Sequence, residues 1–176
     1  MLHHVLHTVN NDLGLWLACL TGLTVSCSLL PRQCLDLNIH MDASFAFGLG
    51  FTMNNHYAGW CLSDSWAADS CDIGWAECVA LELAIYWLIQ EGFRNADVGV
   101  IAAFLNGKSC NATCNNCIRR ITSALVPTCL TISPKYMSSC ENLANPVSHG
   151  HTVGYSTRLA CTFPLPTPLS LWLTTL

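Results

Sequence analysis

The sequence predicts a single α/β domain, and three observations support this fold class. Residues 38–43 alternate in polarity and carry an acid, Asp42, near their end, two β-rich runs flank Asn54-Asn55, and an apolar helix pattern covers about 74–91. Strands that form a meander, followed by helices and a last strand, are typical of a sheet covered by helices. A chain of 176 residues is long enough for one such domain with a substantial core.

Each predicted element has its own signal in the sequence. The segment NIHMDA, 38–43, is predicted as the first strand, and Asn54-Asn55 as the turn of the following hairpin. The long helix is expected from about Gly74 to Glu91, with Gly92 closing it. The later expected elements are a short helix ending at Gly107, a helix entered through Asn111, a strand interrupted by Pro134, a short helix, and an extended, loosely attached tail from Thr162 to Leu176.

Composition and charge limit the functions that the chain can have. Hydrophobic residues make up 52% of the chain, charged residues only 10%, and the net charge is −4. This balance argues against a general polyanion-binding surface. Four of the seven basic residues nevertheless lie within 94–120, namely Arg94, Lys108, Arg119 and Arg120. They suggest a local anionic partner, with an ordinary solvated surface as the competing interpretation.

The twelve cysteines include a C-x3-C-x2-C cluster formed by Cys110, Cys114 and Cys117. A structural zinc site needs a fourth ligand, for which Cys129 and Cys140 are candidates, and it usually has a second C-x2-C pair. The sequence has no such second pair near them. We therefore favour cysteines that bind no metal over a zinc site.

Residues 13–30 form an uncharged stretch, LGLWLACLTGLTVSCSLL, that just reaches the length of a membrane span. Two glycines, four hydroxyl residues and the lack of a preceding Lys or Arg argue against a span or a signal peptide. A small membrane protein therefore remains the least favoured class.

Glu77 raises the main functional question of the sequence. From Ala76 to Ile89 the predicted helix carries only Glu77 and Glu82 as charges, so it has almost no polar outer face. A helix N-terminus favours an acid, and this explains Glu77 without any function. The alternative explanation is a metal site that Glu77 shares with Asp42, the acid at the end of the first predicted strand.

Five stretches in order carry a resemblance to a known family. They are IHMDAS…GLGF, DIGWAECVALELA, GVIAAFLNGKSCNATCNNCIRRI, YMSSCENLANPVSHG and LACTFPLPTPL. Together they resemble the ribonuclease H segment of fungal reverse-transcriptase polyproteins related to DIRS-type, tyrosine-recombinase retrotransposons. The resemblance runs from about Asn11 to the end, and it makes 13–30 similar to the family's soluble linker between polymerase and ribonuclease H.

The resemblance implies a fold, a reaction and a set of site residues. The implied fold is a mixed sheet flanked by helices, and the implied activity is cleavage of RNA in RNA–DNA hybrids with two Mg²⁺ ions held by four carboxylates. Asp42 matches the first catalytic aspartate and Glu77 the catalytic glutamate. Lys108, Arg119 and Arg120 would be the residues that meet nucleic-acid phosphates.

The chain departs from the family pattern at the other two carboxylates. Asn145, in NLANPVSHG, stands where the family has its fourth carboxylate, and His149 stands where it has arginine. The family's strand ending in Ser-Asp-Asn is not recognised before GVI, so one central strand is expected to be deleted at Val98-Gly99. Asp97, beside that gap, is a weak substitute. Two missing carboxylates reduce the charge available to hold Mg²⁺ from about −4 to about −2.

The sequence therefore predicts a degenerate ribonuclease H-like domain over 38–150, preceded by a linker over 1–37 and followed by a proline-rich tail over 151–176. We expect negligible cleavage and weak or lost Mg²⁺ binding. The alternative is a non-catalytic nucleic-acid-binding or polymerase-tethering module. No small-molecule cofactor is expected, the ancestral partner is an RNA–DNA hybrid or another nucleic acid, and an intracellular location is expected.

Overall fold

A computed structural model describes residues 35–69, 71–99, 111–128, 130–135 and 137–176, together with Leu13, Gly14, Trp16, Leu17 and Thr21. Its elements in chain order are β1 Leu35–Ala43, β2 Gly48–Met53, β3 His56–Leu62, the 3₁₀ helix η1 Trp66–Asp69, α2 Ile73–Gln90, β4 Asn95–Gly99, α4 Ala112–Thr128, β5 Thr131–Lys135, α5 Asn145–Ser148, β6 Thr157–Arg158, α6 Thr167–Ser170 and β7 Leu173–Thr175. The predicted α/β class is confirmed as mixed α/β content, with an antiparallel meander and covering helices.

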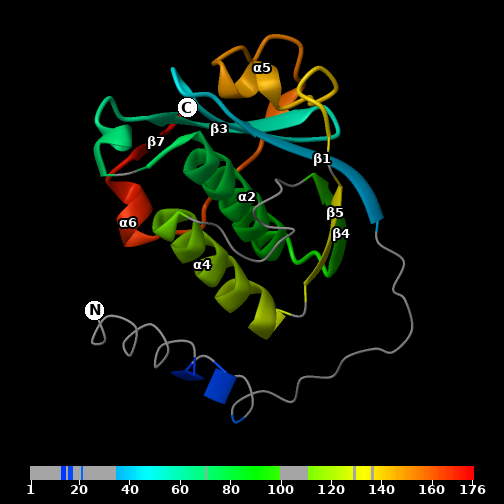
Figure 1. Ribbon diagram of the computed structural model, residues 1–176. Coiled ribbons are helices and arrows are strands. Elements are labelled where there is room, and N and C mark those ends of the chain that lie inside the picture. Colours follow the sequence, from blue (N-terminus) through cyan, green and yellow to red (C-terminus); the bar gives the residue numbers. More distant parts are fainter. Residues whose placement is uncertain are drawn as a thin grey trace.

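One sheet organises the molecule, with the strand order β5-β4-β1-β2-β3-β6. Strands β1, β2 and β3 are antiparallel neighbours, whereas β4 runs parallel to β1 and β5 parallel to β4. Helices α2 and α4 lie on one side of the sheet and α5 on the other (Figure 1). Because both faces are covered, β2 is buried along nearly its whole length.

The predicted hairpin is confirmed at the predicted turn. Asn54 has a φ of +46°, a left-handed conformation that asparagine tolerates better than most residues. The turn pairs Met53 with His56 and fixes the register in which Phe51 faces Ala58. That register places Leu49, Phe51 and Trp60, all buried, in the hydrophobic core.

Helix α2 begins and ends close to the predicted residues. Asp72 caps its start by accepting a hydrogen bond from the Trp75 N–H at 2.8 Å, and Gly92 follows its end with a φ of +76°. It is the one helix in the described part of the chain that is long and apolar enough to cross a membrane, but most of it is buried in the core. This burial explains why the sequence shows no polar face.

Helix α4 packs against α2, and the residue at which it begins is also close to the predicted one. The Asn111 side chain accepts a hydrogen bond from the Thr113 N–H at 2.8 Å and so caps the start of α4, as expected. Cys114, Cys117 and Ile121 are the buried positions of this helix. They follow a helical spacing, so they form the face that contacts α2.

The prediction of a deleted central strand is wrong. Asn95–Gly99 forms strand β4, which lies between β1 and β5 and pairs with both. The sequence pattern favours a helix here because Val98-Gly99 begins an apolar run, and short apolar runs do not distinguish a buried strand from a helix. The expected helix ending at Gly107 otherwise lies outside the described residues.

The prediction of a loosely attached C-terminal tail is also wrong. β7 adds an antiparallel strand to β3, and Leu169 and Leu173 are buried in the core. The Gln90 side chain holds the tail to α2, since its Oε1 accepts from the N–H groups of Thr162 and Phe163 at 2.8 and 3.1 Å. The prolines stop regular structure locally but do not prevent this docking.

Candidate functional site

Asp42 lies near the end of β1 and is held by the segment that includes α5. Its Oδ2 accepts a hydrogen bond from the Ser148 hydroxyl at 2.5 Å, and its Oδ1 accepts one from the Asn142 amide at 3.4 Å. Partial burial raises the pKa of Asp42, although the Ser148 hydrogen bond and the charge of His149 act in the opposite direction. Asp42 is therefore an oriented, half-buried carboxyl group.

Gly50 explains why α5 can approach Asp42 so closely. It pairs with Asp42 in the register of β1 and β2. A Cβ on Gly50 would lie 2.6 Å from both the Ala144 carbonyl oxygen and the Ser148 nitrogen. The backbone of α5 therefore rests directly on the sheet at this glycine.

Glu77 lies on α2, within electrostatic range of Asp42. Burial raises the pKa of Glu77, and the negative charges of Asp42 and Asp72 raise it further. Glu77 is the fifth residue of α2, and the first turn contains no acid. The explanation of Glu77 as an ordinary helix-start acid therefore weakens, because Asp72 already caps the helix and the dipole effect fades after the first turn.

Asp72, Asn142 and Ser148 belong to this site, although the sequence analysis did not identify them. Asp72 Oδ2 accepts a hydrogen bond from the Asn111 side chain at 3.0 Å, which joins the starts of α2 and α4. The capping pattern before α2 could have revealed Asp72. No local signal could have revealed Ser148 as the partner of Asp42, because the pair depends on the tertiary approach at Gly50.

Asn145 and Asp97 have different places relative to Asp42. Asn145 begins α5 and lies in the sequence between Asn142 and Ser148, the two residues that contact Asp42. Asp97 lies on β4 between Ala96 and Val98, whose β1 partners are Leu35 and Ile39. It therefore sits opposite a segment at least three residues before Asp42, roughly 10 Å away along the strand. By this register Asp97 does not replace the third family carboxylate.

Of the three predicted phosphate-binding residues, the structure describes Arg119 and Arg120. Arg120 forms a bidentate ion pair with the fully buried Glu82, with distances of 2.6 and 2.7 Å. Burial opposes the charge of Arg120, but the hydrogen bonds and charge of Glu82 outweigh it and raise the Arg120 pKa. Arg119 donates to the Asn116 side chain at 3.2 Å, and Lys108 lies outside the described residues.

The described residues do not fit a two-ion metal site. Within the ranges that the structure describes, no group of three or more His, Cys, Asp or Glu side chains could hold a metal ion. Asp42, Glu77 and Asp72 do not form such a group, because the oxygens of Asp42 already accept hydrogen bonds from Ser148 and Asn142. The oxygens of Asp72 accept hydrogen bonds from the Trp75 N–H and the Asn111 amide. Mg²⁺ requires several oxygen ligands with compensating charge, which this set does not supply.

The described cysteines of α4 pack in the hydrophobic core. Cys114 and Cys117 are buried between α4 and α2, as is Cys78 on α2. Burial raises the pKa values of the Cys78 and Cys117 thiols, which disfavours the thiolate form that binds metals. Cys110 and Cys129, the other zinc candidates considered with the exposed Cys140, lie outside the described residues.

Comparisons with known proteins identify no relative: no family model matches the chain, and neither a curated protein nor a solved structure matches it.

Proposed function

We propose that the chain is a ribonuclease H-like domain of retrotransposon origin in which the metal-dependent nuclease site is degenerate. The main support is the path of the sheet, β3-β2-β1-β4-β5, with β2 antiparallel to β1 and with β4 and β5 parallel to it. The resemblance implies a mixed sheet flanked by helices, and this path is compatible with it. It places an acid near the end of the central strand β1 and a glutamate on the first long helix.

The two retained acids support the same proposal. The charge of Asp42 contributes to the raised pKa of Glu77, so the two side chains influence each other across elements that are distant in sequence. Perturbed carboxyl pKa values cluster at functional sites, so the raised pKa values of Asp42 and Glu77 favour this proposal. Asn145 and the absence of an acid from 98 to 110 remove the other two carboxylates.

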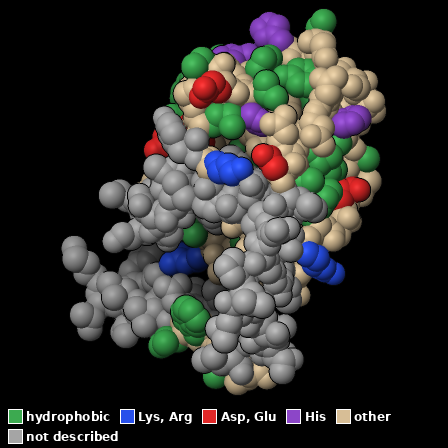
Figure 2. Space-filling model, turned by 90° about the vertical axis from the view of Figure 1, so that its right-hand side faces the viewer, with side chains coloured by type: hydrophobic (Ala, Val, Ile, Leu, Met, Phe, Trp, Pro, Cys, Tyr) green, Lys and Arg blue, Asp and Glu red, His purple; other side chains and the backbone are tan. Residues whose placement is uncertain are grey.

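The alternative, a nucleic-acid-binding module without catalysis, has less support. The Arg120 guanidinium is bound to Glu82. On the face of the molecule that Figure 2 shows, the charged side chains of the described residues are scattered and do not gather in a basic patch. Lys135 is an exposed base, and it lies 3.8 Å from Asp36. An RNA–DNA hybrid would therefore bind weakly and with strong salt dependence.

Restoring one carboxylate tests the proposal. Asn145→Asp adds an acid between the two residues that contact Asp42, so it should increase Mn²⁺ affinity at least about 10-fold over the wild type, measured by isothermal titration. Asn116→Asp, on the exposed face of α4, is the control that adds the same charge elsewhere.

A second substitution identifies the ligands. In the Asn145→Asp background, Asp42→Asn should abolish the gain in Mn²⁺ affinity. An equal gain in Mn²⁺ affinity from Asn116→Asp, or no gain from Asn145→Asp in a folded protein, would contradict the proposal that Asn145 stands in place of a metal-binding carboxylate.

A further inference from the structure

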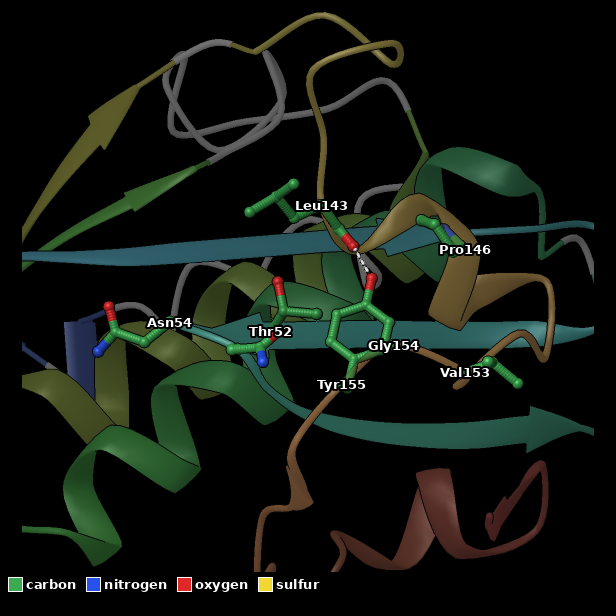
Figure 3. A pocket seen from close by; sticks show the side chains of 8 residues that line it. Thr52, Asn54, Leu143, Pro146, Val153, Gly154 and Tyr155 are labelled. Atoms are coloured by element: carbon green, nitrogen blue, oxygen red, sulfur yellow. Dashed lines mark hydrogen bonds between the residues drawn. The ribbon is translucent and has the colours of Figure 1, made fainter.

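A cleft of about 280 Å³ lies beside α5, at the hairpin end of β2 and away from Glu77. Thr52 and Asn54 line it from the strand and turn, Leu143 and Pro146 from the α5 segment, and Val153 and Tyr155 from the chain that follows. Figure 3 shows the Thr52 side chain rising from β2 between Leu143 and Tyr155.

The Thr52 hydroxyl is the unusual group in this cleft. Thr52 is 2% exposed, and its Oγ1 has no hydrogen-bond partner among the described residues. An unpaired buried hydroxyl destabilises a fold, whereas a methyl group of the same shape would not. The hydroxyl therefore needs a reason other than packing.

The wall formed by Tyr155 is fixed in place. Its hydroxyl donates to the Leu143 carbonyl oxygen at 2.5 Å, and its ring lies 5.7 Å from that of Tyr57. The Asn55 amide donates to the Ser156 hydroxyl at 2.6 Å, which ties the hairpin turn to the same segment. The cleft is thus held open by contacts between residues about 100 positions apart in sequence.

The lining defines the chemistry of a ligand. Among the residues that the structure describes, no Lys, Arg, Asp or Glu lines the cleft, so the part of a ligand that enters it is uncharged. Leu143, Pro146 and Val153 form apolar walls, and 48% of Leu143 and 97% of Val153 are exposed at the rim. A sugar would need more polar partners than these, and an alkyl chain would leave the Thr52 hydroxyl unpaired.

We propose that this cleft binds a neutral, planar nitrogen heterocycle of nucleobase size, with the Thr52 hydroxyl bonding an edge of the ring and Tyr155 contacting its face. The ring would enter beside the Leu143–Tyr155 contact, with the Asn54 amide at the rim near its outer edge. Aromatic side chains bind bases in this way without reading sequence. The proposal does not depend on the proposed function, because the cleft needs neither Asp42 nor a metal ion.

Titration of the ¹⁵N-labelled full chain with adenosine and with uridine tests the proposal. Either nucleoside should shift the amide signals of Thr52, Gly154 and Tyr155, with a Kd of roughly 0.1–1 mM, as expected for a small ligand in a partly open site. A parallel arm with an oligonucleotide, U8, distinguishes a base within a strand from a free nucleoside. Tighter binding of U8 through the same signals indicates the strand.

Thr52→Val removes the hydroxyl and keeps the side-chain shape. It should weaken binding at least about 10-fold, while the Tm stays the same or rises because the unpaired hydroxyl is gone. Thr122→Val, on the exposed face of α4, is the matched control and should change neither the Kd nor the Tm. Absence of shifts with every probe, or wild-type binding by the Thr52→Val protein, would overturn the proposal. So would equal binding of toluene, which lacks a hydrogen-bonding edge.

Discussion

Replacing Arg120 by Met should leave a charge buried without its partner. Glu82 is 0% exposed, and both of its oxygens accept hydrogen bonds from Arg120. Removing one member of a buried ion pair costs about 3–5 kcal/mol, because the other member keeps its desolvation cost. The Arg120 side chain is 24% exposed, which favours the lower end of that range, about 3 kcal/mol. The Tyr86 hydroxyl, which donates to Glu82 at 2.6 Å, compensates for only part of the loss.

Urea unfolding followed by tryptophan fluorescence measures this loss, since Trp60, Trp66, Trp75 and Trp87 are all buried. A loss of about 3 kcal/mol corresponds to a fall in Tm of roughly 6–12 °C for a domain of this size. The double substitution Glu82→Leu with Arg120→Met should recover most of the stability, because no charge then remains buried. The stability of Arg120→Lys should lie between those of the wild type and Arg120→Met, because lysine keeps the charge but lacks the planar guanidinium group.

Two results would refute the reasoning. The first is a loss below about 1 kcal/mol in Arg120→Met, the range of an exposed pair. The second is a double variant no more stable than the single one. Either result would mean that Glu82 does not hold the Arg120 guanidinium strongly, so that Arg120 would again be a candidate for binding phosphates.

Three further predictions concern the site and the tail. Glu77→Gln should raise the Tm at pH 7, because the raised pKa of Glu77 means that the fold disfavours its charge. The stability that the wild type has from this group is present below the ordinary carboxyl pKa and is lost as the pH rises through the raised pKa. In parallel melts the advantage of the variant should therefore shrink at acid pH. Gly50→Ala should destabilise the fold by about 1–3 kcal/mol in urea unfolding, because its methyl would meet the backbone of α5. Gln90→Ala should release the C-terminal tail, seen as faster hydrogen exchange in β7 with exchange in β1 unchanged, and an unchanged β7 would contradict the role of Gln90.

The elements with strong local signals could be predicted from the sequence. The hairpin turn at Asn54-Asn55, the capped helix α4 and the length of α2 all follow from turn, cap and glycine signals that act within a few residues. Strand β4 could not be predicted in the same way. Asn95–Gly99 alternates polar and apolar residues over only five positions, and its pairing with β1 and β5 comes from tertiary context.

The candidate site could be predicted in part for the same reason. Asp42 was identified from the end of a strand, and Glu77 was identified from a charge in an apolar helix. The contact of Ser148 with Asp42 depends on the missing side chain of Gly50, which no spacing rule connects to either residue. Glu82 was noted only as a second charge on the helix, and its pairing with Arg120 became visible only when α2 and α4 were placed together.

Cleavage of a labelled RNA–DNA hybrid in Mg²⁺ or Mn²⁺ tests most directly the claim that the nuclease site is degenerate. Purified wild-type protein and the Asp42→Asn variant should show the same background rate, because under the proposed function the site lacks two of the four carboxylates that would hold the metal ions. A wild-type turnover above about 1 s⁻¹, within the usual range of enzymes, that disappears in Asp42→Asn would contradict it.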